Sequence, residues 1–233
     1  MKEPSTGGRV QVGEMVAVVG GAFLLAASWI VVAARNTVPA AEERVFQVVN
    51  DLPDLLWPIV RGPMQLGSVV GALVVAAAVW FIARDRRLAL AVVIASQGAF
   101  WTARIVKAVV DRGRPADLLD GIEVRERATG LGYLSGHTAV AFAVAAVLAP
   151  SLPRPWRPVV YLVAAVVGFA RIHGGVHLPL DVVGGIGVGL LWGTLTRWSL
   201  GLGGEGLPTS RGDTSDEVAV LEEVEADPPR EDR

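Results

Sequence analysis

Six apolar stretches without a charged residue recur along the chain, and they constrain its fold more than any other feature. Residues 15–34 and 62–83 are each long enough to form a helix across a hydrocarbon core of about 30 Å. Four shorter stretches cover residues 88–103, 138–153, 158–170 and 182–196. These can also cross a membrane, because the ionic side chains beside them can reach the interface. With 52% hydrophobic residues, the chain is predicted to be an all-α integral membrane protein, a six-helix bundle over residues 14–200. A soluble helical protein is the alternative.

Three short segments beside these stretches, at alternate positions along the chain, contain basic residues. The sequence RDRR occupies residues 84–87, two arginines lie in 150–158, and Lys2 and Arg9 precede the first stretch. The positive-inside rule then predicts that residues 1–13 and both termini are cytoplasmic. The other loops, 35–61, 104–137 and 171–181, would face outward from the cell membrane. A cleaved signal peptide is the alternative for the N-terminus, although the first stretch is long for one and no clear cleavage site follows.

The C-terminal end differs in composition from the rest of the chain. Between Glu205 and Arg233 the sequence has ten acidic and three basic residues and few large apolar ones. We expect residues 201–233 to be an acidic disordered tail, with a partner-binding tail as the alternative. The chain has no cysteine, which excludes disulfides and thiolate metal sites. Nothing in the sequence indicates a nucleic acid or a specific protein partner.

Two of the predicted outward loops contain all three histidines of the chain and several basic residues. The segment KAVVDRGRP supplies Lys107 and Arg114, and GYLSGHTAV supplies Ser135, Gly136 and His137. The segment ARIHGGVHLPLD adds four more polar residues, Arg171, His173, His177 and Asp181. A Ser-Gly pair that opens a helix offers free N–H groups to an anion, and arginine binds two phosphate oxygens at once. This set predicts a pocket for a tetrahedral oxyanion, at the interface between the outward-facing side of the cell membrane and water.

A histidine and a carboxylate four residues apart give this pocket a reactive group. Asp181 can accept the N–H of His177 and leave the other ring nitrogen as a nucleophile. His137, from another helix, can protonate a leaving alkoxide. No metal and no other cofactor is expected, because the basic side chains neutralise the charge on the anion.

Other polar residues nearby have simpler explanations. A metal site that includes His173 is an alternative, but Gly174, Gly175 and Pro179 argue against one continuous helix there. We expect His173 and Arg104 to lie at the edge of the pocket. The alternative for Arg104 is a side chain that snorkels to the membrane interface, and the alternative for His173 is that it has no role in the site. Asp111 and Arg112 are expected to pair with each other. The sequence RER at 125–127 belongs to a lid or to a solvated loop.

Three motifs occur in a fixed order along the chain: Lys-x6-Arg-Pro at 107–115, Ser-Gly-His at 135–137 and Arg-x5-His-x3-Asp at 171–181. Together they closely resemble the type 2 phosphatidic acid phosphatase (lipid phosphate phosphatase) superfamily, whose site is shared with vanadium haloperoxidases. The resemblance covers roughly residues 10–200 and omits the acidic tail.

The resemblance implies a role for each matching residue. His177 would attack phosphorus and become phosphohistidine, Asp181 would orient it, and His137 would be the general acid. The phosphoryl oxygens would be bound by Lys107, Arg114, Ser135, Gly136 and Arg171. Water would then hydrolyse the intermediate. Leu134 and Ala170 depart from the proline and serine that the family commonly has there, which affects rate or substrate preference more than the type of reaction.

The resulting hypothesis is a membrane enzyme that removes phosphate from a lipid phosphate or diphosphate. Phosphatidic acid, phosphatidylglycerol phosphate and polyprenyl diphosphate all fit the resemblance. A substrate of the polyprenyl diphosphate or phosphatidic acid type is preferred, and the sequence does not identify the individual lipid. The alternatives are a phosphotransferase that uses an alcohol acceptor, a haloperoxidase and a non-catalytic transporter. Charges that cluster at one interface rather than at the midplane favour an enzyme over a transporter.

Overall fold

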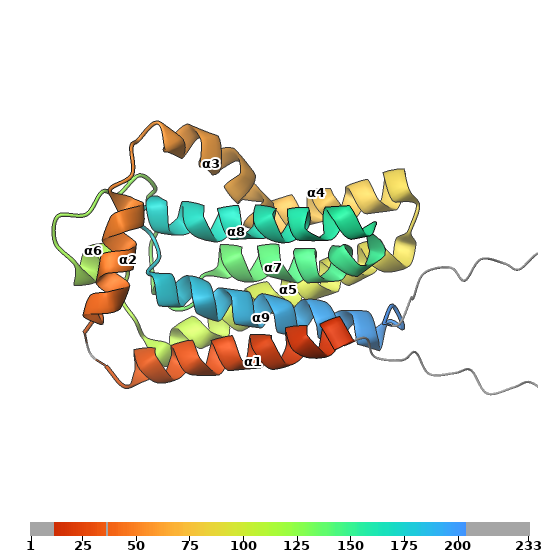
Figure 1. The fold of residues 1–233 in the computed structure, drawn as a ribbon, viewed down its shortest axis with the longest axis horizontal. Helices are drawn as coiled ribbons and strands as arrows, with labels where there is room; N and C mark the ends of the chain where they lie inside the picture. The colour runs from red at the N-terminus through yellow and green to blue at the C-terminus, as the bar shows by residue number, and fades with distance from the viewer. Residues whose placement is uncertain (1–11, 36, 204–233) are drawn as a thin grey trace, which may run out of the picture.

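The computed structural model describes residues 12–35 and 37–203, and every regular element within these ranges is helical. The prediction of an all-α fold is therefore confirmed. The long helices run side by side in a bundle (Figure 1): α1 (Val12–Ala33), α4 (Val69–Ala78), α5 (Arg86–Val110), α7 (Gly136–Leu148), α8 (Arg157–His173) and α9 (Pro179–Ser199). Nearly all of the predicted N-terminal segment 1–13 and of the predicted tail 201–233 lies outside the described residues.

Four helical stretches are long and apolar enough to cross a membrane: α1, α5 with its continuation to Leu118, Arg154–His173, which includes α8, and α9. The predicted span 62–83 is not one straight helix, because its two halves are bent by 71° around Ser68. The first half is α3 (Leu56–Met64) with η1 (Gln65–Gly67), and the second is α4 with the π-helical turn η2 (Val79–Ala83). This bent pair makes a fifth candidate span. A sixth span at α7, which continues through η3 (Ala149–Ser151), stays a prediction because that helix is shorter; η4 (Arg154–Trp156) leads into α8.

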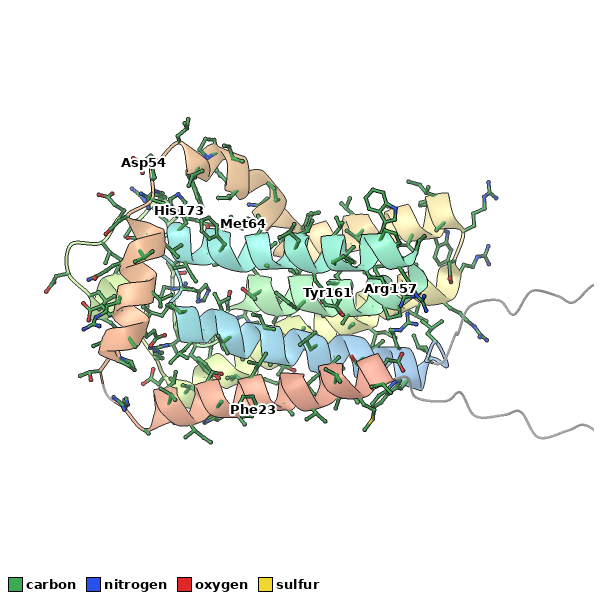
Figure 2. The ribbon with its side chains drawn as sticks, in the orientation of Figure 1. Phe23, Asp54, Met64, Arg157, Tyr161 and His173 are labelled. Atoms are coloured by element: carbon green, nitrogen blue, oxygen red, sulfur yellow. The ribbon has the colours of Figure 1, made fainter. Side chains whose placement is uncertain are left out.

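The outer surface of the bundle is apolar. Large hydrophobic side chains such as Phe23 on α1, Phe81 on η2 and Ile105 on α5 are exposed, and Figure 2 shows Phe23 on the side of α1 that faces away from the other helices. In water such a surface would be unfavourable, whereas lipid chains can cover it. The chain therefore has the surface of an integral membrane protein.

Helix α9 contacts both α7 and α1 extensively, and its glycines allow these helices to approach closely. A Cβ atom at Gly187 would lie 2.6 Å from the carbonyl oxygen of Gly21 on α1. A Cβ atom at Gly189 would lie 2.5 Å from the carbonyl oxygen of Ala139 on α7. Such contacts between small residues are typical of helices that associate in lipid.

One end of the bundle carries the segments with the predicted site residues. Helix α2 (Ala40–Asn50) lies across this end, and the α5–α7 link with the short helix α6 (Pro115–Leu118) is at the same end (Figure 1). The α8–α9 link is at the same end, so the loops 104–137 and 171–181 meet there, as the alternation of spans predicts. Helix α1 begins and α9 ends at the opposite end of the bundle. Which end faces the cytoplasm stays a prediction.

Candidate active site

A cavity of about 600 Å³ opens at this end of the bundle, bounded by α5, the α5–α7 link, the start of α7 and the α8–α9 region. Seven of the ten predicted site residues line it: Arg104, Lys107, Arg114, Gly136, His137, Arg171 and His177. The other three, Ser135, His173 and Asp181, are completely buried. The three motifs thus converge on one cavity, although they are up to 74 positions apart (Lys107 to Asp181).

His177 and Asp181 form the pair that their spacing predicts. Pro179 begins α9, and Asp181 lies in its first turn, where its Oδ2 accepts the backbone N–H of Leu178 at 2.9 Å. The same oxygen lies 3.3 Å from Nδ1 of His177. A carboxylate can only accept in this pair, so Nδ1 is the protonated nitrogen and Nε2 keeps its lone pair.

The surroundings of His177 keep its ring neutral. Burial lowers the pKa of His177 well below the ordinary value, and the positive charges of Lys107, Arg171 and Arg114 lower the pKa further. Only a neutral imidazole has a lone pair for attack, so the cavity holds this histidine in its nucleophilic form.

The second oxygen of Asp181 is held by Arg112, whose Nη1 donates to Oδ1 at 2.8 Å. Arg112 also donates twice to Glu42 on α2, at 2.6 and 3.1 Å. Glu42 in turn accepts the backbone N–H of Leu180 at 2.9 Å. The expected pair of Asp111 and Arg112 is therefore wrong. Asp111 ends α5 in a left-handed conformation (φ 48°) and stays exposed to solvent, while Arg112 compensates two buried carboxylates.

Lys107 and Arg114 are held in place by backbone carbonyls of the α5–α7 link. Lys107 donates to the carbonyls of Leu131 and Gly132 at 2.8 and 2.7 Å, which leaves one N–H of its ammonium group. Arg114 donates from Nε to Gly130 and from its two terminal nitrogens to Val176 and Thr129, which are 2.8–3.0 Å away. Its guanidinium group has five N–H groups, so two remain for an anion in the cavity.

Arg171, the third cation, is paired with a carboxylate. Its Nη1 lies 2.5 Å from Oε2 of Glu126, while its buried Nε has no hydrogen-bond partner within the part of the chain that the structure describes. The neighbouring Arg125 bonds Asp54 at 2.7 Å and the carbonyl of His173 at 2.8 Å. The segment 125–127 is thus fixed against the bundle, and through Glu126 it contacts Arg171, one of the predicted phosphate-binding residues.

The start of α7 brings His137 and Gly136 to the cavity wall. Ser135, just before the helix, turns inward: its N–H donates to the carbonyl of Asp181 at 2.9 Å, and its Oγ accepts from Thr138 at 3.0 Å. The ring of His137 makes no hydrogen bond to any residue that the structure describes. It is therefore free to exchange a proton with a molecule in the cavity.

His173 lies apart from this cavity. Its Nδ1 is 3.0 Å from the carbonyl of Val49, and its ring stacks on Phe169 with ring centroids 5.9 Å apart. Figure 2 shows it at the end of α8. Within residues 12–35 and 37–203, no group of three or more His, Cys, Asp or Glu side chains is arranged to hold a metal ion, so the alternative of a metal site at His173 is not supported.

Comparison with known proteins gives a consistent result. The family model described as PAP2 superfamily matches residues 86–202. An undecaprenyl-diphosphatase from Sulfolobus acidocaldarius is 30% identical over 104 residues, which are 44% of this chain and 50% of that protein; the chain thus spans about half the length of this relative. The crystal structure of Aquifex aeolicus LpxE matches with a TM-score of 0.65 at 24% identity, over 69% of this chain and 97% of that one. A PAP2 type phosphatidylglycerolphosphate phosphatase from Bacillus subtilis matches with a TM-score of 0.61 at 23% identity, over 80% and 95%. The two structures share the fold of this chain.

Proposed function

We propose that this chain, which belongs to the PAP2 superfamily, is a membrane phosphatase that hydrolyses a lipid phosphate or diphosphate through a phosphohistidine intermediate. One observation carries the proposal. A buried histidine, paired with an aspartate and kept neutral, opens into a cavity whose wall includes the side chains of Lys107, Arg114 and Arg171. This combination provides a nucleophile and the positive charge that a phosphoryl group requires.

The phosphoryl group binds first. The free N–H groups of Lys107 and Arg114 and the guanidinium group of Arg171 donate to its oxygens, together with the backbone N–H of Gly136 at the start of α7. Ser135 supports this helix start from behind rather than lining the cavity. The cations neutralise charge that increases on the oxygens in the transition state, and for this reason we propose that no metal ion is required.

The chemistry then proceeds in two steps. Burial and the positive charges of Arg171, Arg114 and Lys107 lower the pKa of His137 to about 4 in the empty cavity, and the negative charge of the bound phosphoryl group offsets these cations, so that His137 takes up a proton with the substrate. Nε2 of His177 then attacks phosphorus, the bond from phosphorus to the ester oxygen breaks, and the protonated His137 gives its proton to that oxygen. Asp181 stabilises the positive charge that forms on the His177 ring. In the second step water attacks the phosphohistidine, His137 takes a proton from the water, and phosphate leaves. The ring of His177 is then neutral again.

The lipid part of the substrate would remain among the apolar side chains of the bundle. We propose that the site faces outward and that both termini are cytoplasmic, on the basis of the basic residues in 1–13, 84–87 and 150–158. We also propose that residues 14–200 form one catalytic domain.

The test is phosphate release by detergent-purified protein in EDTA, with phosphatidic acid, phosphatidylglycerol phosphate, polyprenyl phosphate and polyprenyl diphosphate. His177→Gln is the inactive variant, and His173→Gln is the matched control at a buried histidine outside the cavity. We expect release from at least one lipid by the wild type and by His173→Gln, and at least a 1,000-fold lower rate for His177→Gln, on the order of the loss for other catalytic nucleophiles. No release by correctly folded wild type would refute the proposal, and so would an active His177→Gln variant.

A further inference from the structure

Arg104 lies on α5 one helical turn before Lys107, and both side chains line the same cavity. Its guanidinium carbon is 5.8 Å from the ring centre of Phe100 and 5.9 Å from that of Trp101. No carboxylate that the structure describes forms a salt bridge with it. Arg104 is therefore a cation without an anionic partner, on a helix that crosses the membrane.

The part of the cavity wall that α5 forms changes from apolar to charged along the helix. The lining on α5 extends from Phe100 to Ala108, nine residues that correspond to a rise of about 12 Å along the helix. Lys107 lies near the outer end with the other cations, whereas Phe100 and Ala103 make the inner part apolar. Arg104 lies between these two parts. A lipid phosphate with its phosphoryl group at His177 would thus place the first atoms of its chain near Arg104.

The charges around the cavity are unbalanced. Four cations line it, Arg104, Lys107, Arg114 and Arg171, and no acidic residue of the described chain is in its lining. Glu126 compensates Arg171 from beside the cavity. An arginine within an apolar span is unfavourable unless it reaches water or binds an anion. A side chain that extends to the membrane interface would explain why an arginine is tolerated at position 104. It would not explain why Arg104 lines the same cavity as three other cations.

We propose that Arg104 forms a second phosphate-binding subsite and that the substrate of this enzyme is a lipid diphosphate. This inference rests on the function proposed above. The backbone positions of Arg104 and Lys107 are one turn of α5 apart, about 4.5 Å along the axis for three residues. The guanidinium of Arg104 lies over Phe100 and Trp101, on the side away from Lys107, where the lipid-attached phosphate would follow the terminal one. The terminal phosphate would bind at Lys107, Arg114 and Arg171. The phosphate attached to the lipid would bind at Arg104.

This position places Arg104 on the leaving-group side of the reaction. Nε2 of His177 attacks the terminal phosphorus, and the bond from that phosphorus to the bridging oxygen breaks. The electron pair stays on the bridging oxygen, so a lipid monophosphate leaves. Water then releases phosphate from His177. Arg104 stabilises the negative charge that increases on the departing monophosphate, an interaction that a monophosphate substrate does not offer because its leaving group is an alcohol.

The test compares polyprenyl diphosphate and polyprenyl monophosphate of the same chain length. Arg104→Gln is the test variant. Arg86→Gln is the matched control, because Arg86 also lies on α5 and over an aromatic ring, 5.2 Å from the centre of Trp80, but at the other end of the helix. The measured quantity is the ratio of kcat/KM for the diphosphate to kcat/KM for the monophosphate. We expect Arg104→Gln to lower this ratio by about 10- to 100-fold, the size of one charge-assisted hydrogen bond. Arg86→Gln should leave it as in the wild type. An unchanged ratio in Arg104→Gln would overturn the subsite.

A binding measurement separates this subsite from the proposed reaction. Inorganic pyrophosphate and inorganic phosphate are titrated into the purified protein, and their dissociation constants are compared in the wild type and in Arg104→Gln. We expect the wild type to bind pyrophosphate more tightly and the variant to lose most of that preference. A preference that depends on Arg104 in a protein that hydrolyses no lipid would support the subsite and refute the phosphatase. Hydrolysis without such a preference would support the phosphatase and refute the subsite.

Discussion

Glu42 lies outside the three motifs, yet its removal is expected to slow the reaction. Its side chain is 3% exposed and accepts three hydrogen bonds, two from Arg112 and one from the backbone of Leu180. Glu42→Gln removes the negative charge and replaces one of the two oxygens that accept from Arg112 with an NH2 group, which is a donor and cannot accept. One charge-assisted hydrogen bond is lost, which is about 1.5–3 kcal/mol.

The loss reaches the nucleophile through Asp181. Without Glu42, the charge of Arg112 is compensated by Asp181 alone, so this carboxylate stabilises the positive charge on His177 less. If the whole loss affects the transition state, kcat falls by about 10- to 150-fold. KM should change little, because Glu42 does not line the cavity.

The assay is steady-state hydrolysis of the best lipid substrate, together with thermal unfolding of each variant. Glu43→Gln is the matched control: it removes the neighbouring carboxylate of α2, which is half-buried and accepts a hydrogen bond from Gln47 at 3.3 Å. Wild-type kcat and unfolding temperature in Glu42→Gln would refute the reasoning. A lower unfolding temperature with unchanged kcat would show that Glu42 acts on stability only.

Three further results are expected. Because the pKa of His177 is lowered in the folded protein, the unfolded chain binds a proton below about pH 6.5 that the folded protein does not bind. The contribution of His177 to stability is therefore present above that pH and is lost as the pH falls. The unfolding temperature between pH 7 and 5 should consequently depend on pH less in His177→Asn than in the wild type. Gly189→Leu should lower the unfolding temperature because of the 2.5 Å approach to Ala139, whereas Gly20→Leu should not, since a Cβ at Gly20 meets nothing within 4 Å; equal effects would contradict the packing. Arg114→Lys should lower kcat/KM by roughly 100-fold or more because lysine lacks the planar fork that binds carbonyls and phosphate together, and near wild-type activity would contradict that role.

The sequence predicted the helices and the motif residues of the site for physical reasons. Charge-free apolar stretches have few alternatives to a helix in lipid, and the spacing of His177 and Asp181 is one helical turn. The bend at Ser68 was missed, although Gly62, Pro63 and Gly67 just before it are residues that weaken a helix.

The residues around the nucleophile were harder to predict. Glu42 and Glu126 become partners of Arg112 and Arg171 only because the chain folds, and no local pattern relates residues that are 70 and 45 positions apart. Lys107 and Arg114 are held by backbone carbonyl groups. Every residue has such a group, so the sequence does not indicate which of them will act as partners. Arg112 was expected to pair with Asp111, its neighbour in the sequence. It bonds the buried Asp181 instead, and which aspartate is buried depends on the fold.

The central claim is that His177 carries the phosphoryl group during turnover. The direct measurement is a rapid quench in alkali, with a lipid substrate radiolabelled in its terminal phosphate, followed by peptide mapping of the labelled protein. We expect an alkali-stable, acid-labile label on the peptide that contains His177, absent from His177→Gln and present in Glu43→Gln. Rapid phosphate release by the wild type with no label on this peptide at any quench time would contradict the claim.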